Sequence, residues 1–163
     1  MNRIVFFLTS VMIFSCASLL PREERKVEKI YTTNLTKKQI YDRSLVYFAK
    51  SLGNSNFAIQ IKDESNGRIV SQVSYDCKKY RTFYALNRVT ANFNIDLTAK
   101  DSKYRIIFDD IRLNIYSDNG PQFINEPSNK EELSLVEEGC IEPLRKQLID
   151  GIEGRGIATD SEF

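Results

Sequence analysis

Histidine is absent from the 163 residues of this chain. Without an imidazole, the chain cannot form a Ser-His-Asp or Cys-His catalytic arrangement, bind zinc through histidine, or use a histidine pH switch. Net charge is nearly absent too, because 23 lysines and arginines face 22 aspartates and glutamates. Such a balance gives no global attraction to nucleic acid or to an anionic membrane. The 42% hydrophobic and 28% charged residues are ordinary for one folded domain.

The sequence also lacks an apolar run that is long enough to span a bilayer. The run over residues 4–15 would measure roughly 18 Å as a helix, against the ~30 Å of a hydrocarbon core. Arg3 precedes this run and small residues follow it, which is the arrangement of a cleaved secretory signal. We therefore expect residues 1–15 to be a leader rather than a membrane span or a piece of core.

The end of the leader carries a second signal. The residues Ile13-Phe14-Ser15-Cys16 resemble a bacterial lipobox, in which an aliphatic and a small residue precede a cysteine. The resemblance implies that Cys16 becomes the first residue of the mature chain and carries lipid on its thiol. Acyl chains at that position would anchor the protein to a membrane. The alternative is an ordinary secretory leader in which Cys16 is incidental.

The residues after Cys16 bear on where the protein would be held. Ala17 stands where, in the sorting rule known for enterobacteria, an aspartate retains lipoproteins at the inner membrane. Residues 16–26 contain a proline and mixed charges, which is typical of a short tether. We expect a lipid-anchored protein of the bacterial cell envelope, with the outer membrane favoured and the membrane as a partner through the N-terminal lipid.

Two further cysteines are predicted to point toward the core. Cys77 ends a predicted strand and shares the parity of its inward residues, and Cys140 lies on the apolar stripe of a predicted helix. The cell envelope is a compartment that permits disulfides. The sequence leaves two outcomes open, a bridge between Cys77 and Cys140 or two small buried side chains that do not meet.

The first predicted elements are a strand and a helix. Residues 26–33 are β-branched and aromatic, which favours a short strand. Thr36 and Gln39 then fit a capping box, and the apolar residues that follow recur at helical spacing. A glycine and an asparagine at residues 53–54 are predicted to end this helix.

Three strands with alternating apolar residues are predicted next. Residues 57–63 and 68–76 form a hairpin around an Asn-Gly turn, and an irregular aromatic and basic connection covers residues 77–87. The strand at residues 88–101 alternates almost without fault, so one face meets the core and the other is polar. The polar residues of this strand define the candidate binding face: Thr90, Asn92, Asn94 and Asp96.

The alternation changes parity within the next strand, residues 103–117. Its apolar residues are even-numbered before Asp109 and odd-numbered after Asp110. One extra residue at this point, a β-bulge, would keep both groups on the inward face. We therefore predict a bulge at Asp109-Asp110.

The chain then leaves the sheet. Residues 118–128 are predicted as a loop, and the last helix begins at Ser128 or Asn129, where a glutamate completes a capping box. Pro143 lies inside this helix and lacks an amide proton. It is therefore predicted to kink or break the helix.

The predicted order is β-α-β-β-β-β-α, an α+β two-layer domain over residues 27–152 with a curved antiparallel sheet and both helices on one face. Residues 153–163 are predicted as a flexible tail. The stretches TKKQIYDRSLVYFAKSL, FAIQIKDESNGRIV and IDLTAKDSKYRIIFDDI resemble a bacterial family of unknown function with a TATA-binding-protein-like (TBP-like) fold. The resemblance covers roughly residues 27–150 and brings no catalytic signature. Many members are secreted or lipid-anchored, so it implies the same envelope location.

The name of this fold suggests DNA binding, but the residues argue against it. The polar face lacks the apolar wedges and the excess of lysine and arginine that minor-groove binders use. We therefore predict no nucleic-acid partner. The remaining hypothesis is a binding or assembly module whose polar face or edge strand binds an envelope protein, a peptide or a glycan.

One acidic cluster, Asp109-Asp110 with Asp118 downstream, is the only candidate for carboxylate chemistry. Adjacent strand residues normally point to opposite faces, so these carboxylates are expected to be structural. We predict no metal site, no cofactor and no enzymatic activity. The alternative is a secreted envelope enzyme that uses a carboxylate site around Asp109 and Asp110.

Overall fold

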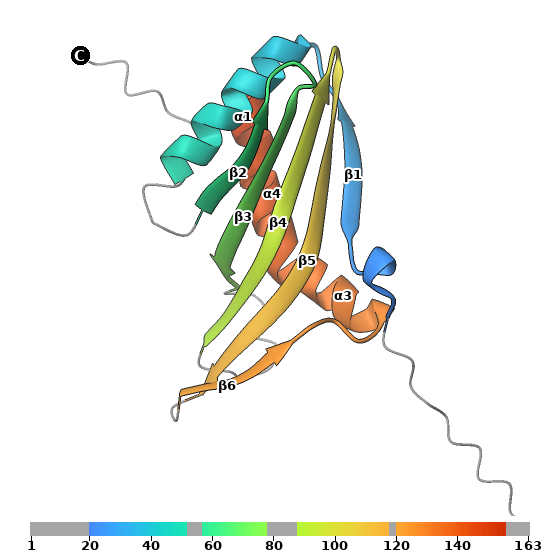
Figure 1. Cartoon of the computed structure of the whole chain (residues 1–163), viewed down its shortest axis with the longest axis vertical. Helices are drawn as coiled ribbons and strands as arrows, with labels where there is room; N and C mark the ends of the chain where they lie inside the picture. Colours follow the sequence, from blue (N-terminus) through green and yellow to red (C-terminus); the bar gives the residue numbers. More distant parts are fainter. Residues whose placement is uncertain (1–19, 52–56, 78–87, 118–119, 156–163) are drawn as a thin grey trace, which may run out of the picture.

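The computed structural model describes residues 20–51, 57–77, 88–117 and 120–155 (Figure 1). The predicted leader with Cys16 lies outside the described residues, as does most of the aromatic connection. In chain order the elements are η1 (Arg22–Glu24), β1 (Val27–Thr32), α1 (Lys37–Ser51), β2 (Phe57–Asp63), β3 (Arg68–Asp76), β4 (Arg88–Lys100), β5 (Lys103–Ser117), β6 (Gly120–Asn125), α3 (Lys130–Val136), η2 (Glu137–Ile141) and α4 (Glu142–Glu153).

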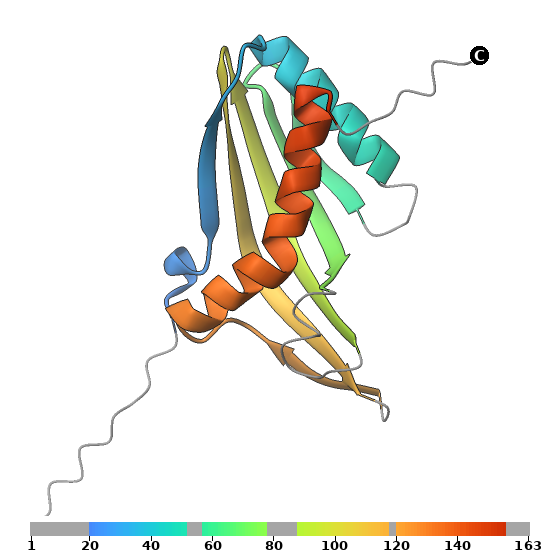
Figure 2. The same ribbon diagram turned by 180° about the vertical axis from the view of Figure 1, so that it is seen from behind.

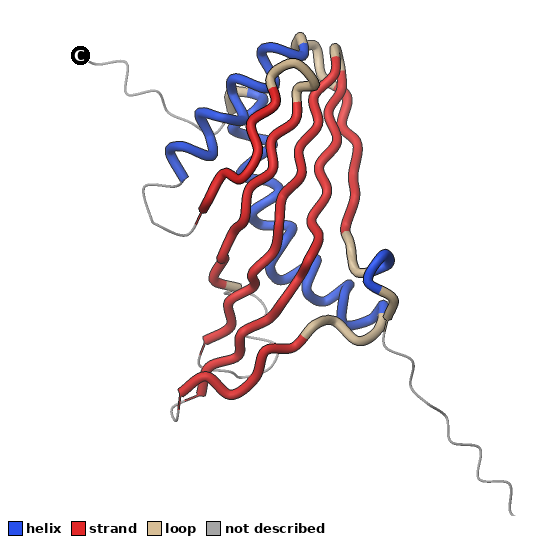
Figure 3. Tube along the Cα trace, viewed as in Figure 1, coloured by secondary structure: helices blue, strands red, loops and turns tan. Residues whose placement is uncertain are grey.

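The strands form one curved antiparallel sheet in the order β1-β5-β4-β3-β2, and β6 extends it along β5 (Figure 3). Both long helices lie against the same face of this sheet, as the view from behind shows (Figure 2). The opposite face carries no described helix, and we call it the open face. The predicted α+β architecture is thus confirmed.

Strand β6 corrects the prediction of a loop over residues 118–128. Its residues pair with the end of β5, from Leu113↔Asn125 to Ser117↔Gly120. A segment with glycine and proline has the composition of a turn, which is why the sequence indicated a loop. The pairing becomes available because β5 continues past the end of β1 and offers a free edge there.

The core lies between the sheet and the helices. Alternate residues of β4 are at most 1% exposed and supply its centre, namely Val89, Ala91, Phe93, Ile95, Leu97 and Ala99. Helix α1 contributes Ile40 and Phe48, both 0% exposed, and α4 contributes Leu148, also 0% exposed. The period-two burial of β4 confirms the inward set read from its sequence.

Strand β5 contains the predicted bulge. Residues 92–94 of β4 lie opposite residues 109–112 of β5, so β5 holds one extra residue there. Asp110 has a positive φ of 50°, a conformation that a short polar side chain tolerates. Because of the extra residue, Phe108 and Ile111 are both buried although their parity differs.

The capping box at the start of α1 is present as predicted. The Gln39 amide donates to the Thr36 hydroxyl oxygen at 3.3 Å, and the Thr36 amide donates to the Gln39 side-chain oxygen at 2.9 Å. These two bonds satisfy backbone donors that the first turn of a helix leaves free.

The last helix begins at an N-cap, as expected. Asn129 accepts a hydrogen bond from the Glu132 amide at 2.9 Å, and the Glu132 carboxylate accepts one from the Ser128 amide at 2.8 Å. Asn129 is therefore the cap, and Glu132 reaches one residue further back than a standard capping box requires.

A π-helical segment, η2, interrupts this helix just before Pro143. Proline has no amide proton and clashes with the preceding turn, and the wider turn absorbs both effects. The helix bends there, so that α4 runs back along the sheet beside α1 (Figure 2). Gly151 permits this approach, since a Cβ atom at that position would lie 2.7 Å from a ring carbon of Tyr47.

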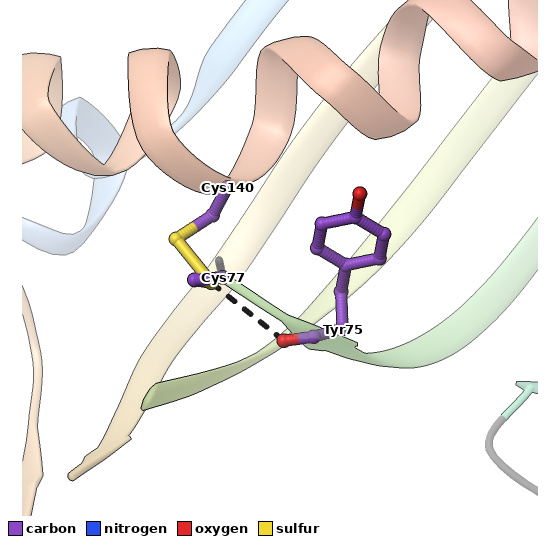
Figure 4. Close-up of a disulfide and its surroundings, with 3 residues drawn as sticks. All are labelled: Tyr75, Cys77 and Cys140. Carbon is purple, nitrogen blue, oxygen red and sulfur yellow. Dashed lines mark hydrogen bonds between the residues drawn. A yellow bond between two sulfur atoms is a disulfide. The ribbon is translucent and has the colours of Figure 1, made fainter. Parts of the chain in front are cut away.

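A disulfide joins the end of β3 to the last helix (Figure 4). Cys77 and Cys140 are both 0% exposed, and their Cα atoms are 4.7 Å apart. The Cys77 sulfur also lies 3.6 Å from the Tyr75 carbonyl oxygen. A disulfide sulfur carries no proton, so this contact is not a hydrogen bond. Of the two outcomes that the sequence left open, the structure shows the bridge.

Candidate binding site on the open face of the sheet

The predicted binding face lies at the centre of the open face, and only part of it is accessible. Asn92, Asn94 and Asp96 are half-buried, whereas Thr90 is 7% exposed. Thr90 has the outward parity that the sequence predicts, but it is buried between its cross-strand partners Asp76 and Asn114. The expectation that Thr90 is an accessible contact residue is therefore corrected.

Two of the other polar residues of that face, Asp96 and Asn94, are engaged with neighbours. Arg68 donates two hydrogen bonds to Asp96, from Nε at 3.1 Å and from Nη2 at 2.7 Å to the same carboxylate oxygen. The Asn94 side-chain amide donates to Asp109 at 3.2 Å. Such cross-strand pairs stabilise the sheet, and they leave less of this surface free for a ligand.

A groove opens further along the same face, near the β4-β5 turn. Its volume is about 330 Å³, at the lower end of the ~300–1,000 Å³ that is typical of ligand pockets. It is lined by Ile30, Thr98, Lys100, Lys103, Tyr104 and Arg105. We call these residues the turn-end groove.

Strand register explains why these side chains meet. Lys100 pairs with Lys103 across the tight turn, and Thr98 pairs with Arg105 one step further along. Arg105 in turn pairs with Ile30 on β1. Residues that are paired in neighbouring strands point to the same face, so the register gathers three cations and one aliphatic side chain.

The floor of the groove is held from the covered side of the sheet. The Tyr104 side chain is 1% exposed and stacks on Tyr31 with ring centroids 5.3 Å apart. Burial, followed by the nearby Glu153 carboxylate, raises the pKa of Tyr104 above its ordinary value. Its hydroxyl donates to Glu153 at 3.4 Å, which links β5 to the end of α4.

The charge in the groove is only partly compensated. Arg105 has one counter-ion, Glu28, with 3.7 Å between the guanidinium nitrogen and the carboxylate oxygen. Within the part of the chain that the structure describes, Lys100 and Lys103 form no ion pair. Ile30 beside them is 66% exposed. The groove thus combines free positive charge with an accessible apolar surface.

The candidate carboxylate site at the bulge has a different character. Asp110 is paired with Arg112 at 2.9 Å and lies 3.9 Å from Arg22, while Asp109 accepts the hydrogen bond from Asn94. The hollow beside Asp110 has a volume of only about 110 Å³. The two carboxylates have separate partners, as expected for neighbours in a strand.

The described residues show neither a metal-binding cluster nor a helix that could span a membrane. No group of three or more cysteine, aspartate or glutamate side chains in the described ranges is arranged to hold a metal ion. Within the same ranges, no helix has the length and apolar content needed to cross a bilayer.

Ile30, Lys100, Lys103 and Arg105 were not among the predicted site residues, although a signal for most of them is present in the sequence. Lys100 continues the outward parity of β4, and the turn at Asp101-Ser102 places it opposite Lys103. What the sequence could not provide is the register of β1 against β5, which brings Ile30 to the same place.

The fold defines a class: an α+β domain whose curved antiparallel sheet carries its long helices on one face and none of the described helices on the other. The family model described as "Domain of unknown function (DUF4468) with TBP-like fold" matches residues 27–114, and the chain belongs to this family. The resemblance noted from the sequence is therefore confirmed, as is the fold that it implied.

Solved structures share this fold at low sequence identity. A TBP-like protein from Parabacteroides distasonis is 15% identical with a TM-score of 0.63, and the match covers 84% of this chain and 97% of that one. A DUF4468 family protein from Bacteroides ovatus is 16% identical with a TM-score of 0.58, and the match covers 91% and 95%. No curated protein matches the chain.

Proposed function

We propose that this protein is a lipid-anchored component of the bacterial cell envelope whose open sheet face binds a protein, peptide or glycan of the same compartment. The observation that carries the proposal is the turn-end groove, with two lysines that form no ion pair with any described residue and an isoleucine that is 66% exposed. An accessible apolar side chain beside free charge is typical of a recognition surface.

Two features support the envelope as the compartment. The leader ends in a lipobox-like sequence at Cys16. The disulfide between Cys77 and Cys140 is of the kind that forms and persists in oxidising surroundings outside the cytoplasm. These two features are independent of each other and favour the same location.

The path of the chain supports an orientation. The Leu20 amide donates to the Ser128 carbonyl oxygen at 2.7 Å, so residue 20 is tied to the start of the last helix. From this end β1 runs along the sheet to the β4-β5 turn (Figure 1). The residues of the turn-end groove lie at that turn. A lipid on Cys16 would hold the end of the molecule that is remote from the groove.

The enzyme alternative receives no support from the described residues. Asp110 is paired with two arginines, and the hollow beside it is about a third of the volume of the groove. We therefore propose a binding function rather than a catalytic one, without a cofactor.

The anchor is tested by labelling cells with radioactive palmitate. The wild-type chain should incorporate label and sediment with the outer membrane, whereas Cys16→Ala should not incorporate label and should accumulate with its leader attached. A chain that fractionates with the cytoplasm, or a labelled Cys16→Ala variant, would contradict the proposed location.

The binding face is tested by photo-crosslinking in intact cells. A photoreactive amino acid in place of Thr98 lies in the groove, and one in place of Lys146, which is exposed on α4, serves as the matched control. We expect a discrete adduct from residue 98 and none from residue 146. Identical patterns from both positions, or no adduct from either, would count against binding at the open face.

A further inference from the structure

Strand β1 lies at the end of the sheet, and its outer edge carries no neighbour among the described elements (Figures 1 and 3). The Thr33 amide donates to the Ser102 carbonyl oxygen at 3.0 Å, so the odd-numbered residues of this stretch direct their backbone groups toward β5. In an antiparallel pair these groups alternate, so Glu28, Ile30 and Thr32 direct theirs to the outer edge.

The same three residues place their side chains on the open face, because Ile30 pairs with Arg105 and Thr32 pairs with Lys103. A strand that was added to β1 would therefore place every second side chain on the open face beside Ile30. These side chains would meet the turn-end groove at its margin. The free edge and the groove thus form one continuous surface.

Charge indicates the chemistry of such a strand. The groove contains three cations, and among the described residues Glu28 is the one carboxylate that forms an ion pair with them. Glu28 itself lies 3.5 Å from Lys26 and 3.7 Å from Arg105, so its charge is shared between two cations. The added strand would therefore find an excess of positive charge, and carboxylate side chains complement it.

We propose that the protein binds an acidic peptide segment, which adds as an extended strand to the outer edge of β1 and directs its carboxylates to Lys100, Lys103 and Arg105. A polypeptide fits better than a lipid or a glycan because only a polypeptide supplies backbone donors and acceptors at strand spacing. An aliphatic residue of the segment would cover Ile30. This inference rests on the proposed function and specifies the partner of the same face.

The test uses the full-length chain in detergent and a fluorescent nine-residue peptide that alternates glutamate with valine. Two matched peptides accompany it: one with glutamine in place of glutamate, and one that keeps the glutamates but is N-methylated at every amide. We expect fluorescence anisotropy to report binding of the acidic peptide. Both matched peptides should bind at least about tenfold more weakly, because the first lacks the carboxylates and the second lacks the backbone donors.

Protein variants separate the edge from the charge. Lys100→Gln with Lys103→Gln should weaken binding about five- to tenfold, and Lys146→Gln on α4 should leave it unchanged. Ile30→Pro removes a backbone donor that points away from β5, a position where an edge strand accepts proline. It should lower affinity while the circular dichroism spectrum stays that of the wild type.

Each other outcome overturns the inference. Equal affinity for the N-methylated peptide would mean that binding depends on charge alone and not on strand pairing. No binding of the acidic peptide at about 1 mM would mean that it is not a ligand. Phosphatidylglycerol vesicles that bind where the peptide does not would assign the surface to lipid. If the peptide fails but residue 98 still crosslinks to an envelope partner, the proposed function stands and only this inference falls.

Discussion

The two faces of the sheet use the same alternating strands for different purposes. On the covered face, β4 and β5 present apolar residues that the helices and the disulfide bury. On the open face, polar residues pair with one another at the bulge, as Asn94 does with Asp109. Near the β4-β5 turn, Lys100 and Lys103 form no ion pair with any described residue. The comparison teaches that neighbouring residues of one strand can serve the core on one face and leave the surface proposed for binding on the other.

The strongest test of this separation is a pair of neighbours in β5. Phe108 is 0% exposed on the covered face, and Ile107, the next residue back, is half-buried on the open face. We expect Phe108→Ala to cost about 3–5 kcal/mol of unfolding free energy, and Ile107→Ala clearly less. Urea denaturation of both variants measures the difference. Equal losses would mean that the open face is also part of a core.

The disulfide should give the next largest effect. Reduction or Cys140→Ser removes a cross-link between β3 and the last helix over a separation of 63 residues. We expect a loss of about 2–4 kcal/mol in unfolding free energy. Thermal melts with and without reductant check this, and reductant should not affect Cys77→Ala with Cys140→Ala. Unchanged melting of the reduced wild type would show that packing alone holds the helix.

The turn between β2 and β3 predicts a pH dependence. Asp63 accepts hydrogen bonds from Ser65 and Asn66, which lower the pKa of Asp63 to about 2. A pKa below the unfolded value of about 3.9 stabilises the fold above that value, and the contribution is lost as pH falls toward 2. Asp63→Asn should therefore show a flatter decline of the unfolding midpoint between about pH 4 and pH 2. A parallel decline in both proteins would contradict the assignment.

The smallest effect on stability is expected in the groove. Lys100→Gln with Lys103→Gln removes two positive charges that have no ion pair in the described structure, so the unfolding free energy should stay within about 0.5 kcal/mol of wild type. Since the two lysines face each other across the turn, the loss of their mutual repulsion favours a slight gain in stability within this range. A loss above 1 kcal/mol would place these lysines among the structural residues.

Much of the fold was predictable because strand periodicity is a strong signal. The buried set of β4 and the bulge in β5 both follow from parity, since a change from even to odd apolar positions requires an extra residue. The capping box at Thr36 and the break before Pro143 follow from local chemistry. Each of these depends on residues that are close in sequence.

The features that the sequence did not predict depend on contacts between residues that are far apart in the chain. Strand β6 forms because β5 offers a free edge, which no property of residues 120–125 indicates. Thr90 is buried although Asn92 and Asn94 on the same face are half-buried. The alternation of polar and apolar residues predicts which face a side chain lies on, but not how far neighbouring side chains bury it. The groove depends on the pairing of β1 with β5, two strands about 75 residues apart, whose register the sequence does not state.

The position of the disulfide has a consequence for how the protein is made. Cys140 belongs to the last helix, so a chain that emerges from its N-terminus delivers α1 and the strands before the segment that carries the second cysteine. Until that segment arrives, α1 alone covers the apolar face of the sheet, and partly bare faces of this kind are prone to aggregate. If the chain is exported, as we propose, export must deliver the last helix before oxidation can close the bridge.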